Sequence, residues 1–138
     1  MPTGSPLYLD TSVALRATLE RGTTPEIESR IAAAPLLVTS RLSLVESSRA
    51  LLRLRQHGGV TERRLADARR ELERLWTRCE LWELSAAVCN LASQVTPDTA
   101  LRTLDALHLA TFLLARRRLE GLELLTADER LEDAASTA

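Results

Sequence analysis

The chain has 138 residues, of which 45% are hydrophobic and 3% aromatic, and its formal net charge is −1. This length fits one domain, residues 1–138, around one core. The low aromatic content argues against an RNA-binding protein that stacks bases on aromatic rings. No apolar run approaches the roughly 18 residues that cross a bilayer. Residues 1–10 lack the basic and apolar parts of a signal peptide, so we expect a cytoplasmic protein.

Charge is unevenly distributed along the chain. All 18 basic residues are arginine; residues 41–78 hold ten of them against five acids, and Arg116–Arg118 add three. Arginine donates bidentate hydrogen bonds to phosphate, so a chain with a net charge of only −1 can present a basic rim around an acidic centre. Codon bias explains an all-arginine set equally well. Cys79 and Cys89, the only cysteines, predict reduced and buried thiols.

Short apolar runs alternate with helical patterns from one end of the chain to the other. Thr11–Ser12 can cap a helix after Asp10, Pro25 suits a first helical position, and Pro35 ends that second helix. One face of a later helix carries five apolar side chains, which are Leu65, Ala68, Leu72, Leu75 and Trp76. The predicted strands are Leu7–Leu9, Leu36–Thr39, Leu81–Leu84 and Leu122–Thr126, and the later helices cover 40–56, 61–78, 85–95 and 103–119.

This alternation predicts an α/β fold with a central parallel sheet covered by helices on both faces. In such sheets ligands bind beyond the carboxyl ends of the strands. Asp10 and Asp128 both come just after predicted strands. We therefore expect a functional site at that edge of the sheet.

Two further acids lie in predicted helices whose neighbouring positions are apolar. Glu46 and Asp105 would each cost several kcal/mol if buried without partners. The simpler explanation is a local ion pair, because Arg49 follows Glu46 by three residues and Arg102 precedes Asp105 by three. The other explanation is a bound cation.

Taken together, the four acids favour the cation. Asp10, Glu46, Asp105 and Asp128 can share one edge of the sheet, and four clustered carboxylates cannot all stay ionised without positive charge. Ligands that offer only oxygen suit Mg²⁺ or Mn²⁺. Two histidines and two cysteines at scattered positions fit no structural zinc spacing.

The segments around these acids resemble the PIN-domain family, and specifically the VapC-like toxins of bacterial toxin–antitoxin pairs. The third segment is the most specific, and the four together span most of the chain in the family's order. They are Tyr8–Ser12, Thr39–Arg49, Leu101–Ala110 and Leu124–Leu131.

This resemblance implies a metal-dependent endoribonuclease that forms a homodimer and is inhibited by a small antitoxin of VapB type. It implies that Asp10 and Asp105 are the principal ligands of Mg²⁺ or Mn²⁺, completed by Glu46 and Asp128. Thr11, Ser12 and Thr126 resemble hydroxyls that orient these acids or contact a phosphate. Arg102 and His108 resemble partners of the acids, although His108 also fits a core histidine. The second histidine, His57, is expected only to end a helix.

One departure from the family concerns the end of the sheet. Such domains continue past the Thr-x-Asp segment into a helix and a final edge strand, whereas the residues after Leu131 are rich in alanine and lack an apolar run. We expect the sheet to lack that strand, or a partner to complete it.

Other functions stay open at this point. A PIN nuclease of housekeeping RNA processing and a non-catalytic PIN-like scaffold share the same pattern. A receiver-type phosphoryl-transfer domain also places acids at strand ends, but it requires a lysine near them, and this chain has none.

Overall fold

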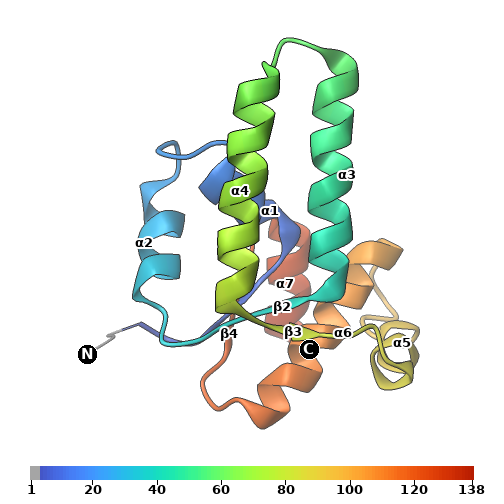
Figure 1. Cartoon of the computed structure of the whole chain (residues 1–138). Helices are drawn as coiled ribbons and strands as arrows, with labels where there is room; N and C mark the ends of the chain where they lie inside the picture. The colour runs from blue at the N-terminus through green and yellow to red at the C-terminus, as the bar shows by residue number, and fades with distance from the viewer. Residues whose placement is uncertain (1–3) are drawn as a thin grey trace.

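The computed structural model describes residues 4–138, in which four parallel strands form one sheet in the order β3-β2-β1-β4 (Figure 1). The expectation that no leader precedes the first strand rests partly on residues 1–3, which lie outside the described residues. The elements are β1 (Leu7–Leu9), α1 (Thr11–Thr18), α2 (Pro25–Ala33), β2 (Leu37–Ser40), α3 (Arg41–His57), α4 (Glu62–Arg78), β3 (Cys79–Trp82), α5 (Ala86–Ala92), α6 (Thr103–Arg118), β4 (Glu123–Leu125) and α7 (Glu129–Thr137).

Alternating side chains of β1, one of the two inner strands, point into two separate cores. Leu7 and Leu9 pack with side chains of α1–α4, whereas Tyr8, between them, packs with Leu109 and Phe112 of α6 and with α7. Because successive side chains of a strand point to opposite faces, helices cover the sheet on both sides. The predicted three-layer α/β/α class is confirmed.

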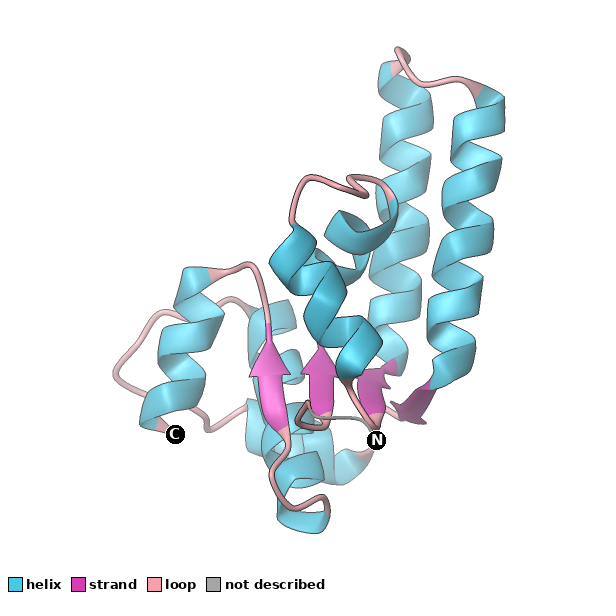
Figure 2. Cartoon of the chain, turned by 90° about the vertical axis from the view of Figure 1, so that its left-hand side faces the viewer, coloured by secondary structure: helices cyan, strands magenta, loops and turns pink. Residues whose placement is uncertain are grey.

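The two longest helices, α3 and α4, form an antiparallel hairpin that projects beyond the sheet (Figure 2). The Ser40 hydroxyl caps α3 by accepting from Leu42 N at 3.0 Å, and α3 ends at His57, as predicted, before Gly58 at φ 73°. The Thr61 hydroxyl caps α4 by accepting from Arg64 N at 3.1 Å. The five predicted apolar positions of α4 are all buried. None of the helices in residues 4–138 has both the length and the apolar character needed to span a membrane.

Several expectations about local structure were wrong. Asp10 itself caps α1, and Thr11–Ser12 form its first turn. Strand β3 begins two residues early, at Cys79, because α4 leads directly into extended backbone paired with β2. Cys89 is exposed on the short helix α5 rather than buried, and Cys79 is only partly covered. The expectation that the sheet lacks a final edge strand is confirmed for residues 4–138, in which no strand follows β4 and α7 occupies that part of the chain.

Candidate active site

Asp10 lies at the centre of a hydrogen-bond network just beyond β1. Its side chain is 5% exposed, and two hydroxyls bind its two oxygens: Ser12 Oγ donates to Oδ1 at 2.6 Å and Thr126 Oγ1 donates to Oδ2 at 2.7 Å. Val13 N also approaches Oδ1, at 3.4 Å, which is the capping bond of α1. Neutral donors from opposite ends of the chain therefore fix the orientation of this carboxylate.

The charge of Asp10 is poorly compensated. Burial raises the pKa of Asp10, and the hydrogen bonds from Ser12 and Thr126 and the charge of His108 oppose this shift without cancelling it. None of the ion pairs formed within residues 4–138 includes Asp10. A buried carboxylate in this condition is electrostatically suited to a cation.

The loop after β4 is tied to the same network through its backbone. Ala127 N donates to Ser12 Oγ and Asp128 N donates to Thr126 Oγ1, each at 3.0 Å. The carboxylate of Asp128 caps α7 by accepting from Arg130 N at 2.9 Å. Asp128 is thus next to the residues that hold Asp10, while its own carboxylate bonds to the helix that follows.

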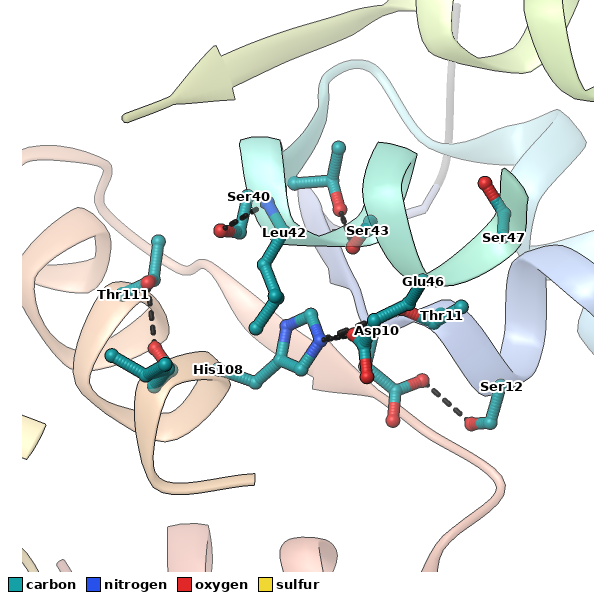
Figure 3. Close-up of polar contacts among 12 residues, drawn as sticks. Asp10, Thr11, Ser12, Ser40, Leu42, Ser43, Glu46, Ser47, His108 and Thr111 are labelled. Atoms are coloured by element: carbon teal, nitrogen blue, oxygen red, sulfur yellow. Dashed lines mark hydrogen bonds and ion pairs between the residues drawn. The ribbon is translucent and has the colours of Figure 1, made fainter. Parts of the chain in front are cut away.

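Glu46 on α3 has partners that are distant in the sequence (Figure 3). Thr11 Oγ1 donates to Glu46 Oε1 at 2.7 Å, and His108 Nε2 lies 2.6 Å from the same oxygen. Burial acts to raise the pKa of Glu46, but these two hydrogen bonds and the charges of His108 and Arg53 outweigh it, so the pKa is lowered. Glu46 is therefore held as a carboxylate. The ion pair expected from Arg49 is not among those formed in the described residues.

His108 is a core histidine and a partner of an acid at once. Its side chain is 2% exposed, and its second ring nitrogen, Nδ1, lies 2.9 Å from the hydroxyl of Tyr8. Sequence reasoning missed Tyr8. The available signal was that the only tyrosine of the chain occupies a buried strand, where its hydroxyl needs a hydrogen-bond partner.

Asp105 lies in the first turn of α6, three residues before His108, so both project from one side of that helix. Its carboxylate is 3.4 Å from Arg102 Nε, which is the simpler ion pair considered for it. Across residues 4–138 no three Asp, Glu, His or Cys side chains form a ready-made metal site. The structure thus connects Glu46 to Asp10 through Thr11, which follows Asp10 in the chain and donates a hydrogen bond to Glu46. The convergence of all four acids on a cation stays a prediction.

The buried carboxylate of Asp10 and the partly buried one of Glu46, at the carboxyl edge of a parallel sheet, place the chain among α/β proteins with an oxygen-rich acidic site. A family model described as "PIN domain" matches residues 7–136, so the chain belongs to the PIN-domain family, as the motifs indicated.

Two curated proteins of Mycobacterium tuberculosis, Ribonuclease VapC45 and Ribonuclease VapC49, are each 36% identical to this chain over 101 residues, 73% of this chain and 69% of theirs. Among solved structures, PAE2754 from Pyrobaculum aerophilum aligns with a TM-score of 0.69 at 19% identity, over 97% of this chain and 82% of its own. VapBC2 from Rickettsia felis, bound to a DNA fragment from its promoter, aligns with a TM-score of 0.61 at 13% identity, over 89% of this chain and 99% of its own.

Proposed function

We propose that the chain is an endoribonuclease that hydrolyses RNA phosphodiester bonds with Mg²⁺ or Mn²⁺, and that it is the toxin of a toxin–antitoxin pair. The observation that carries this proposal is the buried carboxylate of Asp10, which has only neutral donors. The next residue in the chain, Thr11, donates a hydrogen bond to Glu46. The two Mycobacterium tuberculosis relatives named as ribonucleases support the choice of RNA as substrate.

The donor set fits a hard divalent cation because every candidate ligand offers oxygen. Asp10 and Asp105 would be the principal ligands, and Glu46 and Asp128 would complete the set, directly or through water. When bound, such a cation supplies a water of lowered pKa and neutralises charge on the phosphate oxygens. Ser12 and Thr126 keep the Asp10 carboxylate in one orientation for this purpose.

The chain's arginines would hold the RNA backbone without reading its sequence. Several are already engaged, as in the pairs of Arg41 with Glu83 and Arg55 with Glu62. Arg53 is exposed on α3, two helical turns after Glu46, and its charge contributes to lowering the pKa of Glu46, so it is our candidate for a phosphate contact near that acid. A recessed acidic site reaches looped or single-stranded RNA more readily than a phosphate within a regular helix.

An antitoxin of VapB type would bind along the α3–α4 hairpin. One side of α3 is buried in the protein core, but two of its apolar residues, Val45 and Leu52, are 55% and 39% exposed. Next to α3 lies a groove of about 550 Å³, and its apolar lining comes from α1, α3 and the segments that directly follow them: Leu15, Leu19, Ala50, Leu54 and Val60. An amphipathic helix fits such a groove, and an arginine following it would occupy the carboxylates bidentately.

The test begins with the chain purified alone and incubated with RNA and Mn²⁺. We expect cleavage in wild type, loss of cleavage in Asp10→Asn and Asp105→Asn, and unchanged cleavage in Asp98→Asn, which alters an exposed loop acid. Absence of cleavage in wild type, on structured and unstructured RNA alike, would leave the non-catalytic scaffold as the better account.

A second test separates a toxin from a housekeeping nuclease. Overproduction of wild type, but not of Asp10→Asn, should arrest growth, and co-expression of a small neighbouring protein should relieve the arrest. Cleavage without toxicity or such a partner would favour RNA processing. We also propose that residues 1–138 form one domain, that the protein is a homodimer, and that it is cytoplasmic; light scattering and fractionation test the last two.

A further inference from the structure

The two oxygens of Glu46 have different surroundings. Thr11 and His108 both bond to Oε1, at 2.7 and 2.6 Å, and no donor within the described residues 4–138 bonds to Oε2. The side chain is 24% exposed, so the carboxylate is held at one oxygen and open at the other. This arrangement suits a metal ligand, because the hydrogen bonds at Oε1 fix the group while Oε2 stays free to bind.

The chemistry of the partners assigns the protons in this network. A carboxylate only accepts hydrogen bonds, so the contact at 2.6 Å requires a proton on His108 Nε2. When the ring is neutral it carries only this one N–H, so Nδ1 is then the acceptor and Tyr8 donates to it at 2.9 Å. The hydroxyl of Tyr8 thus favours the ring form that donates to Glu46.

Packing against several helices and strands holds the rings of Tyr8 and His108 in place. Tyr8 is 0% exposed on the central strand, with its ring edge-to-face against Phe112 at 6.0 Å and against His108 at 6.1 Å between centroids. The four residues of this network come from four different elements: Tyr8 from β1, Thr11 from α1, Glu46 from α3 and His108 from α6. Rotation of the His108 ring would therefore break its two short hydrogen bonds, to Tyr8 and to Glu46, at once.

We propose that Tyr8 and His108 act together as positioning residues that hold Glu46 Oε1 and present Oε2 to the candidate metal site. This inference rests on the proposed function. A positioning role can be told from a purely structural one, because removal of His108 should then change the affinity of the protein for a cation as well as its stability.

The decisive comparison uses His108→Ala, His108→Gln and Tyr8→Phe, with Ser43→Ala as the matched control. Ser43 is fully buried on α3, one turn before Glu46, and accepts a hydrogen bond from Thr39 at 2.8 Å without bonding to Glu46. Mn²⁺ affinity is measured by calorimetry on the protein without RNA, and kcat and KM are measured separately on a short RNA.

We expect His108→Ala to weaken Mn²⁺ binding by roughly 10- to 100-fold, the usual effect of removing a residue that orients a metal ligand. Tyr8→Phe should lose less, and His108→Gln should recover part of the affinity because its amide can donate to Glu46. In each case kcat should fall while KM stays near wild type. Ser43→Ala should lower the melting temperature and leave Mn²⁺ affinity unchanged.

A second readout needs no metal. Nitrogen-15 spectra of the metal-free protein should show that the neutral ring of His108 carries its proton on Nε2, and a neutral ring with its proton on Nδ1 would overturn the assignment. Wild-type Mn²⁺ affinity in His108→Ala, or an equal loss in Ser43→Ala, would overturn the positioning role alone. A wild type that binds no Mn²⁺ would overturn the proposed metal site and the role of Oε2 with it.

Discussion

Replacement of Asp10 by asparagine should stabilise the metal-free protein and destabilise it relative to wild type once Mn²⁺ is present. The raised pKa of Asp10 means that the folded state disfavours the ionised carboxyl, because burial outweighs the hydrogen bonds from Ser12 and Thr126. Asparagine has nearly the same shape and no charge. The substitution therefore removes the electrostatic cost of the empty site together with its affinity for a cation.

The expected magnitude follows from the contacts of Asp10. Burial of an unpaired carboxylate costs roughly 3 kcal/mol after relaxation, and losing the charge from two hydroxyl hydrogen bonds forfeits about 1 kcal/mol each. The metal-free variant should gain about 1 kcal/mol, or about 4 °C in melting temperature for a chain of this size. Free Mn²⁺ at about 100 times its dissociation constant should add about 2.7 kcal/mol to wild type, or about 10 °C.

Thermal melts of wild type, Asp10→Asn and the control Asp98→Asn, each with EDTA and with Mn²⁺, measure both effects. The order of stability should invert between the two conditions. Because the pKa of folded Asp10 lies above its unfolded value, the stability it contributes is present below the unfolded pKa and lost as pH rises through the folded pKa. The advantage of asparagine should accordingly shrink on acidification. A variant less stable than wild type in EDTA would refute the electrostatic reasoning, and an unchanged wild-type melt in Mn²⁺ would refute the metal site.

Three other predictions are independent of one another. Burial raises the pKa of the Cys79 thiol to about 12, so a thiol reagent at about pH 8, where only thiolates react readily, should modify the exposed Cys89 alone, and Cys89→Ser should abolish the rapid phase. Leu109→Ala, at a fully buried position of α6, should cost about 2–5 kcal/mol in urea unfolding. In the cleavage-deficient Asp10→Asn background, Arg53→Gln should weaken RNA binding and reduce the slope of log affinity against log salt by about 1; an unchanged slope would show that Arg53 contacts no phosphate.

Local chemistry in the sequence was sufficient for most of the fold. The helices expected at 40–56 and 61–78 do begin at these points, where the hydroxyls of Ser40 and Thr61 cap them, and the spacing of apolar residues identified the buried face of α4. The start of β3 escaped prediction because pairing decides it: Cys79 is opposite Leu37 of β2, and a register with a distant strand leaves no mark in a local pattern.

At the candidate site, too, local patterns in the sequence identified some residues and missed the contacts between distant segments. A carboxylate after a strand was enough to single out Asp10. The partner of Glu46 was sought within one helical turn, at Arg49, whereas the structure supplies it from His108, 62 residues away. Helical periodicity finds neighbours on one element and cannot find those that topology brings together. Tyr8 escaped notice for a related reason, since its side chain reaches the site from the opposite face of the sheet to Leu7 and Leu9.

The ion pair between Arg102 and Asp105 bears on whether Asp105 is available to a cation. Arg102 is 73% exposed and its Nε lies 3.4 Å from the carboxylate, and surface pairs of this kind contribute about 0–1 kcal/mol. A divalent cation that binds Asp105 would displace only this weak contact. Glu46 and Asp10 differ, because short hydrogen bonds hold Glu46 Oε1 and both oxygens of Asp10. The salt bridge thus accounts for the orientation of Asp105 in the absence of metal, and it is too weak to argue against Asp105 as a ligand.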